Sequence, residues 1–235
     1  MAALLRTTFG FGDAVVGMPL LTLLPVGLHT DISLLGLCGL TVAALAVATG
    51  WRHADRRSLA RLLAAAAVGI PVGLALVRLA PAPVVIAILG GALFAYGVYG
   101  LAAPPDATAA AHHPAAEDHW AYLFGFLSGA LGGAYNFNGA PVAVYGSLRG
   151  WAPQRFRGTL QAYFLASGLL IVAGQAIGGL WPSDLGTLYA ACLPALAAAT
   201  VLGTLLQRHL PAERFRRAVF VLILALAALM LAHAL

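Results

Sequence analysis

One short pattern of glycine and proline occurs twice, 122 positions apart, within otherwise apolar sequence. Glycine and proline at this density do not continue a straight helix through lipid, because the freed N–H and C=O groups need partners. Two such breaks at corresponding positions of two halves are typical of the substrate site of a secondary transporter. The residues concerned are Gly10, Gly17 and Pro19, and then Gly132, Gly139 and Pro141.

The composition indicates a membrane protein made almost entirely of helices. Of the 235 residues, 61% are hydrophobic and only 9% are charged, which leaves little room for a soluble domain. All thirteen basic residues are arginines, and they lie mostly in short loops, which is typical of membrane orientation rather than nucleic-acid binding. We therefore expect an all-α, multi-pass membrane protein. We expect no cleavable signal peptide, since Met1 leads directly into the first interrupted segment.

The apolar segments divide the chain into two halves of the same order. We expect a first repeat over 1–103, a polar linker over 104–118 and a second repeat over 119–235. Each half begins with an interrupted segment and continues with three spans of about 20 residues, the length that crosses ~30 Å of hydrocarbon. The expected interrupted segments are 4–28 and 119–149, and the spans are 31–50, 61–79, 84–102, 157–180, 187–207 and 214–235.

The positions of the arginines favour one topology over another. Eleven of the thirteen lie in the loops 51–61, 149–157 and 208–217. If each interrupted segment enters and returns on one side, these three loops all face the cytoplasm, as the positive-inside rule requires. Each half then has three crossings, so the two repeats are inverted relative to each other. The alternative, in which each interrupted segment crosses once, places most arginines outside.

The second break has a direct physical interpretation. Gly132 and Gly133 allow a first half-helix to end, and Asn138 is a good N-cap for a second one. Pro141 then falls in the first turn, where its missing N–H costs nothing. A returning half-helix over about 139–149 spans ~15 Å, which places its N-terminus near the middle of the membrane.

Two facing half-helix N-termini in a low-dielectric cavity form an anion site that needs no lysine. Asn136 and Asn138 add amide donors to such a site. A simpler interpretation also stays open, in which the glycines only allow helices to pack closely.

The chain resembles the sulfite exporter TauE/SafE family, also called the toluene sulfonate uptake permease family. The resemblance rests on GFGDAVVGMPLL in the first half, and on GALGGAYNFNGAPVAVYGSLRGW followed by FRGTLQAYF in the second. It extends over essentially the whole chain. It implies an exporter or importer of sulfite, sulfonates, sulfoacetate or other small sulfur-containing anions, located in the bacterial inner membrane.

The breaks and the resemblance together select candidate site residues. Arg6 either pairs with an oxyanion or is a flanking residue that reaches toward the lipid headgroups. Asp13 is a candidate for proton coupling, with a capping role or a pair with Arg6 as alternatives. Arg157 and Gln161 reach the cavity mouth in one interpretation and lie on a solvated face in the other. The predicted substrate-binding residues are Arg6, Gly10, Gly12, Asp13, Gly17, Gly133, Tyr135, Asn136, Asn138, Gly139, Arg157 and Gln161.

We predict a secondary transporter that works by alternating access and uses the proton gradient, since the chain has no P-loop for ATP. The expected partners are a small anion and the lipid bilayer, with a homodimer left open and no nucleic acid; no enzyme activity, metal or cofactor is expected. Three alternatives stay open. They are a channel-like anion facilitator, a metal permease that uses the histidine-rich stretch 112–119, and a thiol-redox protein that uses Cys38 and Cys192.

Overall fold

The fold is given by a computed structural model, which describes residues 27–47, 51–102, 119–206, 220–221, 223–229 and 231–232. Residues 1–26, which contain the first break, and most of the linker lie outside the described residues. The predicted site residues Arg6, Gly10, Gly12, Asp13 and Gly17 therefore lie outside them too.

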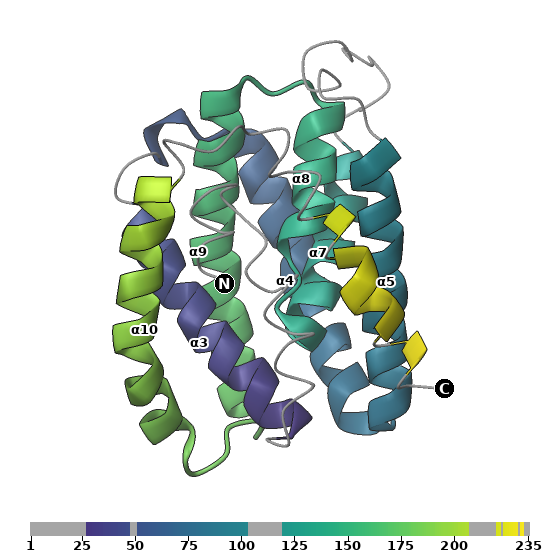
Figure 1. The fold of residues 1–235 in the computed structure, drawn as a ribbon. Coiled ribbons are helices and arrows are strands. Elements are labelled where there is room, and N and C mark those ends of the chain that lie inside the picture. The colour runs from purple at the N-terminus through teal and green to yellow at the C-terminus, as the bar shows by residue number, and fades with distance from the viewer. Residues whose placement is uncertain are drawn as a thin grey trace.

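The described residues form helices and no strand, as the composition predicts. Helix boundaries agree with the expected spans to within about five residues, because charged residues, glycines and prolines end the apolar runs. The helices are α3 (Leu28–Val47), η1 (Trp51–His53), α4 (Arg56–Leu79), α5 (Ala82–Ala102), α7 (Trp120–Tyr135), α8 (Gly139–Leu148), α9 (Pro153–Ile177) and α10 (Leu185–Leu206) (Figure 1). Residues 220–221, 223–229 and 231–232 are also helical.

Several of these helices have the length and hydropathy of membrane spans. Within the described residues, Arg56–Leu79, Pro83–Ala102 and Gln154–Ile177 are long and apolar enough to cross a bilayer. His29–Leu45 and Leu185–Ala199 are apolar but shorter. Many large apolar side chains on the outside of the bundle are exposed, which fits a surface that faces lipid.

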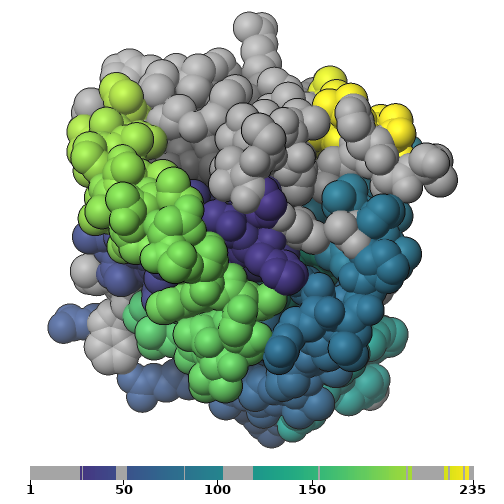
Figure 2. Space-filling view, turned by 90° about the horizontal axis from the view of Figure 1, so that it is seen from below, coloured from purple at the N-terminus to yellow at the C-terminus, as the bar shows by residue number. Residues whose placement is uncertain are grey.

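Contacts between helices fix their relative directions. Ser33 Oγ donates to the carbonyl of Leu180 at 3.0 Å, and Leu40 lies 3.4 Å from the Cβ position of Gly168. The start of α3 therefore lies beside the end of α9, and the two helices are antiparallel. Thr41 Oγ1 lies 2.5 Å from the hydroxyl of Tyr189, so α3 runs in the same direction as α10. Seen from below, α3 lies between α10 and α5 (Figure 2).

The remaining directions follow in the same way. The start of α4 lies beside the start of α9, and Leu74 of α4 contacts Gly174 near the end of α9, so these two helices are parallel. Gly90 of α5 faces Leu231 and Gly100 faces Phe220, so α5 and the C-terminal helix are antiparallel. The helices α3, α4 and α5 therefore run in directions opposite to those of α9, α10 and the C-terminal helix, respectively.

Glycines hold α7 against α4 at very short range. The two helices run in the same direction, and a Cβ atom on Gly125, Gly129 or Gly133 would lie less than 3.0 Å from a backbone oxygen of α4. Gly69 and Gly73 of α4 face α7 in the same way. Small residues at such a spacing let two membrane helices approach until their backbones touch. Of the glycines in the predicted break, Gly133 belongs to this row, and close helix packing is the role that the structure shows for it.

Two of the arginine-rich loops meet at one end of the bundle. Arg155 Nη2 lies 2.6 Å from Asp55 Oδ2, and the N–H of Asp55 donates to Thr159 Oγ1 at 2.9 Å. Although partial burial raises the pKa of Asp55, hydrogen bonds from Ser58 and the Arg155 charge lower it below its usual value. The predicted common face of the loops 51–61 and 149–157 is confirmed, and 208–217 lies outside the described residues. The single-crossing alternative, which places these two loops on opposite faces, is wrong.

This arrangement predicts which loops are labelled from one side of the membrane. We expect single cysteines that replace Arg56 and Gln154 to react with an impermeant maleimide from the same side, because both positions are exposed at the end where Asp55 meets Arg155. Cysteines that replace Pro81 and Asp184 are expected to react from the opposite side. The measurement compares right-side-out and inverted vesicles, with Cys38→Ser and Cys192→Ser as the background. Labelling of 56 and 154 from different sides would contradict the fold.

Candidate functional site

The helices α7 and α8 form a hairpin whose two arms lie side by side. The rings of Phe124 and Tyr145 lie 5.8 Å apart between centroids, although a continuous helix would separate them by about 31 Å. The arms have 16 and 10 residues, or about 24 and 15 Å, so neither crosses ~30 Å of hydrocarbon. Both arms have their outer ends at the end of the bundle where α9 begins (Figure 1).

The first arm ends at Asn136 rather than at the two glycines. Asn136 adopts the left-handed conformation with φ of 57°, which asparagine tolerates better than other residues with a side chain. Its N–H donates to the carbonyl of Gly132 at 2.8 Å, and the N–H of Phe137 donates to that of Leu131 at 3.2 Å. The predicted end at Gly132 and Gly133 is wrong, since both are helical and Gly133 is the residue that packs on α4.

The second arm begins where the sequence predicts, but without the predicted cap. Asn138 occupies the N-cap position of α8, and Pro141 lies in the first turn. The side chain of Asn138 makes no capping hydrogen bond, because it points to α9 and donates to Ser167 Oγ at 2.9 Å. Ser167 is near the middle of the 25 residues of α9, so α8 starts near mid-depth of the bundle. Its first N–H groups are those that a helix leaves without internal partners.

A closed chain of hydrogen bonds fixes this tip between α7 and α9. Asn138 Nδ2 donates to Ser167 Oγ, and Ser167 Oγ donates to the carbonyl of Tyr163 at 2.7 Å. The hydroxyl of Tyr163 donates to Ser128 Oγ at 2.7 Å, and Ser128 Oγ donates to the carbonyl of Asn138. All four residues are buried, so these bonds lie in a low-dielectric interior.

A second polar group joins the tip to α3. Asn136 Nδ2 donates to the carbonyl of Ile32 at 2.6 Å, and Gln175 Nε2 donates to Asn136 Oδ1 at 3.3 Å. Both amide oxygens point at Gly36, where a Cβ atom would lie 2.8 Å from Gln175 Oε1 and 2.9 Å from Asn136 Oδ1. Gln175 Oε1 is buried and has no hydrogen-bond partner among the described residues.

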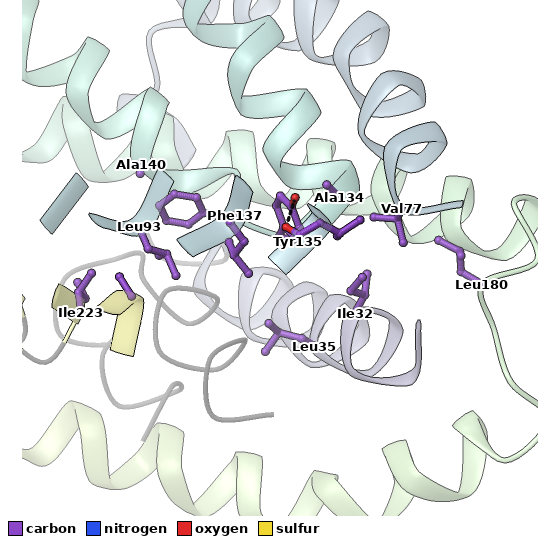
Figure 3. Close-up of a cluster of buried hydrophobic side chains, with 13 residues drawn as sticks. Ile32, Leu35, Val77, Leu93, Ala134, Tyr135, Phe137, Ala140, Leu180 and Ile223 are labelled. Atoms are coloured by element: carbon purple, nitrogen blue, oxygen red, sulfur yellow. Dashed lines mark hydrogen bonds between the residues drawn. The ribbon is translucent and has the colours of Figure 1, made fainter. Parts of the chain in front are cut away.

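An apolar cluster encloses the tip on its other side. Tyr135 and Phe137 are buried in it with Leu93 of α5 and Ile32 of α3 (Figure 3). The hydroxyl of Tyr135 donates to the carbonyl of Val85 at 2.6 Å. The tip therefore has polar groups on the side of α3 and α9 and packs against an apolar cluster on the side of α5.

A profile of the family described as "Sulfite exporter TauE/SafE" matches residues 1–230. The chain belongs to the sulfite exporter TauE/SafE family. The resemblance read from the sequence motifs is thus confirmed, and membership together with the apolar helices identifies a membrane transport protein. The family indicates sulfur-containing anions as the transported class. No curated protein and no solved structure matches the chain.

The fold of this TauE/SafE protein brings some of the predicted site residues together. Tyr135, Asn136, Asn138 and Gly139 all lie at the hairpin tip and are buried or half-buried. Gly133 lies on the face of α7 that packs against α4, next to the carbonyl oxygen of Ile70.

Two predicted residues on α9 lie apart from the tip. Arg157 is exposed in the second turn of α9, eighteen residues or about 27 Å along the helix from Gln175. Gln161 is half-buried on the same helix, six residues before Ser167. Neither forms one of the hydrogen bonds that fix the tip of the TauE/SafE hairpin.

The polar residues of α9 that surround the tip are absent from the predicted set. Tyr163, Ser167 and Gln175 recur at multiples of four, which places them on one face of α9 within an apolar span. That spacing was the available signal, since polar residues inside membrane helices are costly and usually functional. Asp31 of α3 was also missed; it is 2% exposed and precedes Ile32, to which Asn136 is bonded.

Some of the residues on which the metal-permease and thiol-redox alternatives rest lie within the described residues. Among the described residues of this TauE/SafE protein, no three His, Cys, Asp or Glu side chains gather as metal ligands. His119 is exposed at the start of α7, and 112–118 lie outside the described residues. Cys38 lies on α3 and Cys192 on α10, and neither joins a disulfide.

Proposed function

We propose that this TauE/SafE protein is a secondary transporter of a small sulfur-containing anion, such as sulfite or an organosulfonate, which binds at the hairpin tip. The observation that carries the proposal is the buried start of α8, near mid-depth, without a side-chain cap. Such a helix start offers N–H groups and the positive end of the helix dipole to an anion.

The donors that we assign are backbone groups rather than the asparagine amides. The side chains of Asn136 and Asn138 already donate to Ile32 and Ser167, so they position the tip. The N–H groups of Gly139 and Ala140 belong to the first turn of α8, where Pro141 contributes none. An anion bound there replaces the missing cap.

We further propose that the two halves, 1–103 and 119–235, are inverted repeats. The opposite directions of α3–α5 and of α9, α10 and the C-terminal helix support this. A second hairpin with Gly10, Gly12 and Gly17 at its tip, flanked by Arg6, then faces the first one. Alternating access follows if one hairpin and its helices rock against the other.

Coupling to protons requires a carboxylate that exchanges a proton during the cycle. Asp13 is the candidate from the sequence, and Asp31 is a second candidate because it is almost completely buried beside the residue that holds Asn136. Substituting Asp13→Asn and Asp31→Asn separately shows which one responds: the proton-carrying residue is the one whose loss makes uptake insensitive to a pH gradient.

The test of the function is flux in proteoliposomes. Radiolabelled sulfite trapped inside is expected to exchange with external sulfite, and unlabelled sulfite on the far side is expected to accelerate the exchange. Such trans-stimulation requires a carrier whose site faces one side at a time. Flux that rises linearly with concentration, without trans-stimulation, would instead support the channel-like alternative.

A further inference from the structure

Gly132 is the residue of α7 that lies against the start of α8. A Cβ atom on Gly132 would lie 2.9 Å from the Cβ atom of Asn138 and 2.8 Å from Cδ1 of Ile171. Ser128, four residues earlier and therefore on the same face of α7, donates its hydroxyl to the carbonyl of Asn138. This face of α7 thus holds the tip, while Gly133 on the neighbouring face packs against α4.

The two obstacles to a side chain at this position differ in how easily they move. Cδ1 of Ile171 is the end of a flexible side chain and can rotate away. The Cβ atom of Asn138 is attached directly to the backbone at the N-cap of α8, so it moves only with the tip. The helix α7 cannot retreat instead, because Gly129 and Gly133 hold it against the backbone of α4.

A methyl group on Gly132 therefore displaces the tip. Carbon atoms in contact are about 3.5–4.0 Å apart, so Asn138 has to move by roughly 0.6 Å or more. The hydrogen bond of 2.9 Å from Asn138 Nδ2 to Ser167 Oγ then stretches beyond good geometry. The N–H groups of Gly139 and Ala140 follow Asn138 directly in the first turn of α8, so they move with it.

We propose that Gly132 is a positioning residue of the anion site. Because it has no side chain, Asn138 rests directly on α7, and this contact sets where the N–H groups of Gly139 and Ala140 meet the anion. The inference rests on the proposed function and adds to its site a residue that does not touch the anion. The two adjacent glycines of the break then have separate roles, since Gly132 places the tip and Gly133 joins α7 to α4.

Replacing Gly132 by alanine tests this role through affinity as well as stability. We expect sulfite to bind Gly132→Ala at least about tenfold more weakly than the wild-type protein, as after the loss of one hydrogen bond to a charged group. The measurement is calorimetry on the folded full-length protein in nanodiscs. Gly168→Ala is the matched control, because Gly168 follows Ser167 in α9 and a Cβ atom there would meet Leu40 Cδ1 at 3.4 Å, an ordinary contact. This control should keep the wild-type affinity.

A second variant shows whether Gly132 acts through Asn138. In the double variant Gly132→Ala with Asn138→Gly, the obstructing Cβ atom of Asn138 is absent. Gly132→Ala should therefore lower the melting temperature of the wild-type protein by more than it lowers that of Asn138→Gly. If Gly132→Ala alone does not fold, a folded double variant shows the same dependence on Asn138.

The outcomes separate this inference from the proposed function. No binding of sulfite by the wild-type protein overturns both. Binding by Gly132→Ala with the wild-type affinity overturns the positioning role and leaves the anion site intact. Equal losses of stability in the two backgrounds, or a double variant that does not fold while Asn138→Gly does, also overturn it, because Gly132 then acts through other contacts. A tenfold loss of affinity in Gly132→Ala, with Gly168→Ala unchanged, supports it.

Discussion

Replacing Gly129 by leucine is expected to leave almost no folded protein. A Cβ atom at this position would lie less than 3.0 Å from the carbonyl oxygen and the Cα atom of Ala66. Both are backbone atoms of α4, which cannot rotate away as the end of a side chain can. The helix α7 would have to move outward over its whole length, because Gly125 and Gly133 touch α4 in the same row.

The expected loss in the free energy of unfolding exceeds that of ordinary overpacking, which costs about 1–3 kcal/mol. We expect loss of the monodisperse peak in size-exclusion chromatography and loss of cooperative thermal unfolding. Gly91→Leu is the matched control, since Gly91 lies in α5 with nothing within 4 Å of its Cβ position. If Gly129→Leu were as stable as Gly91→Leu, the close contact of α4 and α7 would be refuted.

Replacing Asn138 by alanine is expected to reduce sulfite exchange by tenfold or more while the protein stays folded. The substitution removes the hydrogen bond to Ser167 Oγ, which costs about 1 kcal/mol of stability. Ser167 Oγ keeps its bond to the carbonyl of Tyr163, so the interior retains most of its pairing. The start of α8 loses its fixed position, and the anion loses the aligned N–H groups of Gly139 and Ala140.

Stability and transport measured on the same preparations separate the two effects. Asn138→Asp is expected to bind sulfite even more weakly, because a carboxylate beside the start of α8 repels an anion. Gln154→Ala, an exposed amide on α9, should leave both the melting temperature and the exchange rate unchanged. Normal exchange by Asn138→Ala would remove the hairpin tip from the transport path.

Much of the fold was predictable because its causes are local. Apolar runs bounded by charged residues located most of the helices, and the paired glycine and proline pattern located the break before α8. The count of arginines in three loops predicted that 51–61 and 149–157 share a face, and the bond between Arg155 and Asp55 confirms it.

The details of the tip were not predictable because distant helices determine them. Asparagine is a good N-cap residue, but the side chain of Asn138 donates to Ser167 of α9 instead of capping α8. Gly132 and Gly133 are typical of a helix end, but Gly133 packs on α4 and the helix continues to Tyr135, with Asn136 as its C-cap. Gln175 contacts the tip only through Asn136, and Gly36 of a third helix leaves room for both amides.

The location of a bound anion decides whether the start of α8 is the anion site. Selenite is a close analogue of sulfite, and its selenium gives an anomalous signal that marks one atom in a crystal. We expect a peak within hydrogen-bonding reach of the N–H groups of Gly139 and Ala140, beside Asn138. A peak only at the arginine-rich end of the bundle, near Arg155, would contradict it.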